Sequence, residues 1–164
     1  MSPILKDRQM SVEVKRVIFE GVLTPILLYG AETWSTTTRE DSRIQSAEMY
    51  VLRAIMGKTR RDRQRNERIR EEVGVKAILN KMDAARLRWW GHLERMQEGR
   101  GAKKRWEWRP EETRPRGRPR KRWESSVEDS LRRHGLPSMQ EMREDGVLED
   151  RGRFRRVLAP LTGS

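Results

Sequence analysis

Residues 75–97 read VKAILNKMDAARLRWWGHLERMQ, and this stretch carries the clearest helical pattern in the chain. Its apolar residues recur at separations of three, four or more residues, as they do on one face of an α-helix. They are Val75, Ile78, Leu79, Met82, Trp90, Leu93 and Met96. We expect Trp90 in the core and Trp89 at its edge, because neighbouring residues on a helix cannot share one face.

The polar side of the same helix carries three arginines, Arg86, Arg88 and Arg95, which we expect to face solvent or a polyanion. Gly99 and Gly101 follow and interrupt the helical pattern. Residues 100–122 then contain three prolines and Gly117. Proline disrupts helices, so the sequence predicts only a short extended piece there, at residues 104–108.

Three helices are predicted before residue 75. Residues 11–30 have apolar side chains near the helical period, with a kink at Pro25 and a stop at Gly30. A second helix over 39–56 follows a capping pattern in which Thr38 pairs with Asp41, and it should end at Gly57. A short third helix is predicted over residues 66–73, ended by Gly74.

After the proline-rich stretch, short helices are predicted over residues 123–134, 138–144 and 150–158. No alternating strand pattern is present. The predicted fold class is therefore all-α: a small helical bundle, an extended Arg/Pro-rich linker and a weakly packed helical tail. The corresponding segments are a helical domain over 1–99, a basic linker over 100–122 and a tail over 123–160.

Composition limits the kinds of function available to the 164 residues. The chain has no cysteine, which excludes disulfides, thiol catalysis and cysteine-based zinc sites. Its histidines, His92 and His134, lack ligand spacing, so we expect no metal and no cofactor. The apolar stretch 17–31 is too short for a bilayer, and no signal-peptide pattern opens the chain. We expect a soluble nuclear or cytoplasmic protein that is neither secreted nor inserted in a membrane.

The net charge of +12 is concentrated in one part of the chain. Basic and acidic residues balance over 1–57 and over 136–164, so the whole excess lies in residues 58–135. Residues 100–122 alone hold 11 basic and 3 acidic residues. Such a concentrated block predicts a surface that binds nucleic acid, RNA or DNA, through its phosphates; a polar linker that orders on nucleic acid is the alternative.

Twelve residues of this block are the candidate phosphate contacts: Arg60, Arg61, Arg63, Arg65, Lys103, Lys104, Arg105, Arg116, Arg118, Arg120, Lys121 and Arg122. Three tryptophans, Trp106, Trp108 and Trp123, lie among or beside them. Aromatic rings between arginines can stack on unpaired bases, and they can equally pack the basic stretch onto the helices. Both interpretations stay open.

Residues 114–121 read RPRGRPRK and match the core of an AT-hook. In that interpretation Gly117 allows close approach to the floor of an A·T minor groove, which flanking arginines enter. The alternative is a basic linker that clamps phosphates of any sequence. An eight-residue match favours the second interpretation.

Five blocks in order resemble the thumb region of reverse transcriptases from non-LTR (LINE-like) retrotransposons. They are residues 22–34 (VLTPILLYGAETW), 63–67 (RQRNE), 87–96 (LRWWGHLERM), 117–123 (GRPRKRW) and 150–154 (DRGRF), the last with Phe154 where the family usually has tryptophan. The resemblance implies an all-helical thumb and post-thumb region that grips template and primer during target-primed reverse transcription. Its partners would be RNA, DNA and the rest of a retroelement polymerase.

One departure separates the chain from an active polymerase of that family. Its palm requires paired aspartates that hold two metal ions, and no Asp-Asp pair occurs in this sequence. We therefore expect a fragment without polymerase activity and without a catalytic residue. Two other hypotheses are a stand-alone DNA-binding protein that uses the AT-hook-like segment and a translated retroelement relic without a selected function.

Overall fold

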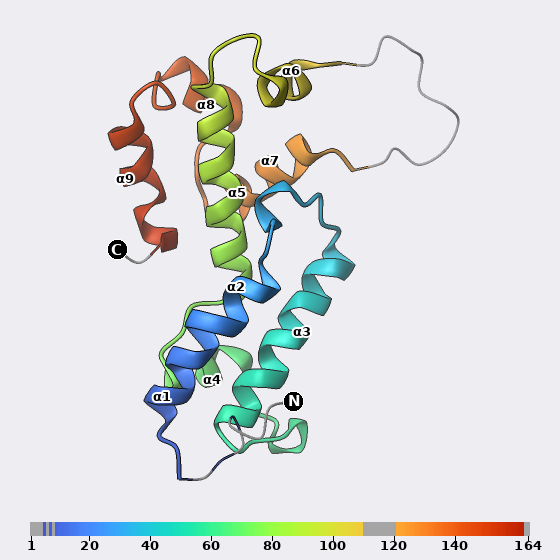
Figure 1. Cartoon of the computed structure of the whole chain (residues 1–164), viewed down its shortest axis with the longest axis vertical. Helices are drawn as coiled ribbons and strands as arrows, with labels where there is room; N and C mark the ends of the chain where they lie inside the picture. The colour runs from blue at the N-terminus through green and yellow to red at the C-terminus, as the bar shows by residue number, and fades with distance from the viewer. Residues whose placement is uncertain (1–4, 6, 8, 110–120, 163–164) are drawn as a thin grey trace, which may run out of the picture. The chain divides into compact units, whose positions relative to one another are not determined.

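The computed structural model describes residues 5, 7, 9–109 and 121–162. Every regular element among these residues is helical, which confirms the all-α prediction (Figure 1). The chain divides into two compact units, and each is described by itself. Unit 1 comprises Met1–Gly30 and Thr37–Met82, and unit 2 comprises Ala31–Thr36 and Asp83–Ser164. One boundary between the units, at Met82 and Asp83, falls inside a helix. The segments expected at 1–99, 100–122 and 123–160 stay a prediction.

The first helix of unit 1 changes its winding just before Pro25. Helix α1 (Val12–Ile18) leads into a π-helical turn (Phe19–Leu23) and then into α2 (Thr24–Leu27). The N–H of Thr24 donates to the carbonyl of Phe19, five residues earlier. Proline has no N–H and crowds the carbonyl four residues before it, and a wider turn relieves both problems. The distortion predicted at Pro25 is therefore accommodated by the π-turn.

Helix α3 (Thr38–Ile55) begins with a capping box one residue earlier than the sequence pattern predicted. Thr37 caps it: the Glu40 N–H donates to the Thr37 hydroxyl, and the Thr37 N–H donates to the Glu40 carboxylate at 2.7 Å. The predicted pair of Thr38 and Asp41 is wrong, because glutamate at the third position reaches back to the cap better than aspartate. The predicted exit at Gly57 is confirmed by its φ of +64°.

Helix α4 (Asn66–Val73) ends at Gly74 as predicted, with a φ of +76°. It packs with α1 and α3 around a core that includes Phe19, Leu52 and Ile69, each at most 1 % exposed. The carboxylate of Glu48 is fully buried in this unit. It accepts hydrogen bonds from Arg70 Nη2 at 2.7 Å and from the Ile78 N–H at 2.9 Å. These partners stabilise a charge that would otherwise destabilise the core.

Helix α5 (Ile78–Glu94) begins in unit 1 and continues into unit 2 from Asp83 onward. Helix α6 (Gly101–Glu107) follows, so the extended piece predicted at residues 104–108 is wrong. The prolines that suggested it start only at Pro110, and Lys103 and Glu107 form an ion pair one helical turn apart at 3.1 Å. The remaining helices are α7 (Trp123–Arg133), α8 (Met139–Glu144) and α9 (Arg151–Thr162).

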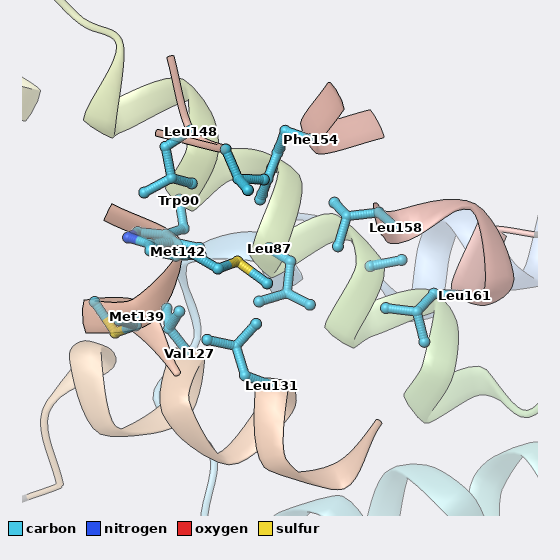
Figure 2. Close-up of a cluster of buried hydrophobic side chains, with 12 residues drawn as sticks. Leu87, Trp90, Val127, Leu131, Met139, Met142, Leu148, Phe154, Leu158 and Leu161 are labelled. Carbon is cyan, nitrogen blue, oxygen red and sulfur yellow. The ribbon is translucent and has the colours of Figure 1, made fainter. Parts of the chain in front are cut away.

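The tail of the chain supplies most of the core of unit 2. Figure 2 shows Leu87 and Trp90 of α5 surrounded by side chains of α7, α8 and α9. Trp90 is fully buried, as predicted, and Leu131, Met142 and Leu158 are each at most 2 % exposed. The tail is therefore packed tightly, contrary to the expectation of a weakly packed one, because its helices enclose α5 instead of trailing from it.

A buried network of polar groups joins α5 to α7. Asp83, fully buried, accepts hydrogen bonds from Ser130 at 2.9 Å and from Arg86 at 3.0 Å on one carboxylate oxygen. Its other oxygen accepts from Arg133 at 2.8 Å and lies 3.0 Å from His134 Nε2. Arg86 is only 1 % exposed, so the expectation that it faces solvent or a polyanion is wrong. Its guanidinium neutralises the buried carboxylate instead.

Candidate nucleic-acid interface

The strongest candidate surface in unit 1 is a turn between α3 and α4, residues 59–65, which we call the arginine turn. A short 3-10 helix (Arg60–Asp62) opens it, capped by Thr59. The Asp62 carboxylate accepts a hydrogen bond from the Thr59 N–H at 2.6 Å, and Arg63 has a φ of +48°. This left-handed residue reverses the chain, so the backbone of the turn is well defined.

The arginine turn is fastened to α3 by Arg53. Its guanidinium donates to the Asn66 side-chain oxygen at 2.8 Å and to the Gln64 carbonyl at 3.4 Å. Both acceptors belong to the 63–67 block that the sequence singled out. The basic residue that organises this block is therefore on α3, where the sequence pattern gave no sign of it.

The arginine turn presents its cations to solvent. Within the described parts of the chain, no ion pair involves the side chains of its four arginines, which are all exposed: Arg60, Arg61, Arg63 and Arg65. The only carboxylate in the turn is that of Asp62. Hydrogen bonds from the N–H and the hydroxyl of Thr59 lower the pKa of Asp62, so it stays charged but is directed at its own backbone.

The candidate phosphate contacts in unit 2 differ in how accessible their side chains are to solvent. Lys103 is buried; its ammonium donates to the Glu94 carbonyl at 3.2 Å and pairs with Glu107, so it is less available to a phosphate. Lys104 and Arg105 are exposed on α6. Lys121 pairs with Asp129 at 2.7 Å, and Arg122 is half-buried just before α7.

Three candidates, Arg116, Arg118 and Arg120, lie outside the described residues, as does most of the AT-hook-like segment. The tryptophans beside that segment are described. Trp106 and Trp123 meet edge to face with ring centroids 5.3 Å apart, and the Trp123 indole donates to the Glu32 carbonyl at 2.8 Å. Both rings therefore make packing contacts within unit 2. Trp108 is 61 % exposed, so its ring is accessible to a base.

The sequence did not lead us to predict a second group of cations, on α9. Residues 136–164 are electrically balanced as a whole, yet their acids all lie at or before Asp150 and their arginines mostly after it. Helix α9 consequently carries four arginines and no acid: Arg151, Arg153, Arg155 and Arg156. Charge counted helix by helix, instead of over one long segment, would have revealed them.

The described residues contain neither a metal-binding cluster nor a membrane-spanning helix. No group of three or more histidine, aspartate or glutamate side chains is arranged to hold a metal ion there. No helix in the same part of the chain has both the length and the apolar character that crossing a bilayer requires.

The fold and the candidate surface together define a small, basic, all-α protein with clustered exposed arginines. Comparison adds one relative: the chain is 30 % identical over 112 residues to an uncharacterized transposon-derived protein of Caenorhabditis elegans. The match covers 64 % of this chain and 40 % of that protein. No protein-family model matches the chain, and no solved structure matches it. The similarity indicates a transposon origin.

Proposed function

We propose that this chain binds the sugar–phosphate backbone of RNA and DNA as a thumb-like remnant of a non-LTR retrotransposon reverse transcriptase. The observation that carries the proposal is the arginine turn, with four exposed guanidinium groups and no ion-pair partner among the described residues. Two lines support its origin: the five ordered sequence blocks and the similarity to a transposon-derived protein. The chain has no polymerase chemistry of its own in this role.

Binding follows from the chemistry of guanidinium groups. Each presents several N–H donors in a plane that matches two oxygens of a phosphate. A phosphate bound in this way releases condensed counterions, and that release provides most of the binding free energy. The hydrogen bonds of Thr59 and Arg53 hold the backbone of the turn, so less conformational entropy is lost on binding. Because these contacts reach phosphates and not base edges, little sequence preference is expected.

The experiment is a binding titration of a labelled RNA–DNA hybrid at low ionic strength, followed by fluorescence anisotropy. The double variant R60Q/R61Q removes two charges from the arginine turn. Its matched control, R39Q/R43Q, removes two charges from exposed positions on α3 of the same unit. We expect R60Q/R61Q to weaken binding about tenfold, and the control about twofold or less.

Equal losses in the two variants would contradict the assignment of the site to the arginine turn. A wild-type protein that binds no hybrid would contradict the proposed function itself. The hypothesis of a relic without function makes a separate prediction, a shallow thermal transition by circular dichroism. The two apolar cores instead predict a cooperative one.

A further inference from the structure

Helices α5 and α9 of unit 2 form a groove of about 730 Å³ whose walls are cationic. Arg88 and His92 line it from α5, Arg95 from just after the end of α5, and Arg151 and Arg155 from α9. Phe154 and Leu158 supply its apolar floor. Among the described residues, none that lines the groove is an aspartate or a glutamate.

Beside the groove, α9 approaches α5 closely at a glycine. A methyl group at Gly91 would lie 2.3 Å from Cε1 of Phe154, so only glycine admits the ring at this point. The ring packs edge to face on Trp90, with centroids 5.9 Å apart, and Figure 2 shows Phe154 and Leu158 of α9 directed toward α5. The same contact that closes the core thus brings the arginines of the two helices to one groove.

One of these arginines is held in place by the protein itself. The guanidinium of Arg95 lies 5.6 Å from the centroid of the Phe154 ring and donates to the Leu148 carbonyl at 2.9 Å. Partial burial and the proximity of Arg151 lower the pKa of Arg95, although an arginine remains protonated at neutral pH. The guanidinium is therefore fixed in an electropositive environment.

Two neighbouring carboxylates, Asp150 and Glu94, are engaged elsewhere. Asp150 accepts hydrogen bonds from the N–H groups of Gly152 and Arg153, at 2.6 and 3.2 Å. Glu94 accepts from Trp90 at 2.8 Å and from Arg143 at 2.6 Å. Within the described residues, no ion pair involves the three remaining arginines of the groove: Arg88, Arg151 and Arg155. Like charges gathered without a counter-charge repel one another, and a bound anion removes that repulsion.

We propose that the groove of Arg88, His92, Arg95, Arg151 and Arg155 is a second phosphate-binding site, which holds the backbone of RNA or DNA. This assignment rests on the proposed function, because the phosphates are taken to be those of RNA or DNA. The guanidinium groups bind the phosphate oxygens, Arg95 from a preset position and the exposed arginines by closing around them. The apolar floor limits the competing hydration of the site.

Helix α9 offers a closely matched pair of variants to test this site. R151Q/R155Q removes two charges that line the groove. R153Q/R156Q removes two exposed charges from the same helix that do not line it. Each variant is titrated with a labelled RNA–DNA hybrid and, separately, with inorganic tripolyphosphate, whose binding is followed by calorimetry.

The proposal predicts that R151Q/R155Q binds the hybrid about tenfold more weakly than the wild type and loses tripolyphosphate binding, whereas R153Q/R156Q changes either affinity about twofold or less. Equal effects of the two variants on both ligands would overturn the groove as a site. Selective loss of tripolyphosphate with unchanged hybrid binding would overturn its assignment to nucleic acid. If the wild type bound tripolyphosphate in the groove but no hybrid, the proposed function would be contradicted. The groove would still be an anion-binding site.

Discussion

The ring of Phe154 lies directly against the backbone of Gly91, so that a side chain at Gly91 would overlap its Cε1 and Cζ atoms at 2.3 and 2.9 Å. The two residues belong to different sequence blocks and lie 63 positions apart in the chain. Their contact sets the distance between α5 and α9, and with it the geometry of the core and of the cationic groove. It also explains why a phenylalanine is accommodated in the block of residues 150–154: its ring fits the space that Gly91 leaves open.

The replacement Gly91→Ala should destabilise unit 2 by about 1–3 kcal/mol, because the buried Phe154 ring must move out of its packed position. Urea denaturation followed by tryptophan fluorescence measures the change. The control is Gly101→Ala, at a position in α6 where a methyl group meets nothing within 4 Å. Alanine favours helix there, so stability should stay equal or rise slightly. Equal destabilisation by both replacements would contradict the close contact of α5 and α9.

Replacing the buried Asp83 tests the polar network between α5 and α7. Asp83→Ala leaves the guanidinium of Arg86 buried without its carboxylate, and such losses cost about 3–5 kcal/mol. Asp129→Ala is the control, because Asp129 pairs with Lys121 and Arg132 at the surface. That change should cost no more than about 1 kcal/mol. Comparable unfolding midpoints for the two variants would show that Asp83 is not essential to the fold.

The stability of unit 2 should depend on pH through the carboxyl group of Glu94. Burial raises the pKa of Glu94, but hydrogen bonds from Arg143 and Trp90 outweigh that effect and leave it below its usual value. The charged form therefore stabilises the folded state above the usual pKa of glutamate, and this contribution is lost as the pH falls through the lowered value. We expect Glu94→Gln to be less stable than wild type at neutral pH, with a difference that shrinks in acid. Thermal unfolding measured at several pH values checks this, with the exposed Glu98→Gln as the control. A difference that stayed constant with pH would rule out the assigned role of the Glu94 charge.

The arginines outside the described residues also have a predicted effect. The variant R116Q/R118Q/R120Q should weaken binding of A·T-rich and G·C-rich duplexes to a similar degree, because phosphates are common to both. Competition between the two duplexes on the wild-type protein measures the preference directly. A strong preference for A·T-rich DNA that disappears in the variant would favour the AT-hook interpretation instead.

The sequence predicted the helices well because local signals define most of them. Gly57 and Gly74 end helices in the left-handed conformation, as their positions suggested, and the apolar spacing of residues 75–97 identified Trp90 as core. Two errors were local, at the cap of α3 and in α6, and the others arose where contacts distant in sequence decide the outcome. Arg86 looked like a surface residue because its partners, Asp83 excepted, come from Trp34, Thr36 and Ser130.

The candidate site could be predicted only in part from the sequence, for the same reason. The arginine turn is contiguous, so its charges stood out as a cluster, although the role of Arg53 in fastening it did not. The groove combines α5 with α9. Residues 136–164, which contain α9, are electrically balanced as a whole, and the excess over residues 58–135 did not single out α5. Such a site becomes visible only when the Gly91–Phe154 contact places the two helices together.

The most direct test of the account is the salt dependence of the wild-type protein's affinity for an RNA–DNA hybrid. If backbone phosphates are the ligand, a plot of log Kd against log salt concentration should be linear and steep, with a slope of about 0.7–0.9 for each phosphate contacted. Several contacts would weaken binding at least about tenfold between low and physiological salt. A flat plot, or no detectable binding to any hybrid or duplex at low salt, would contradict the account.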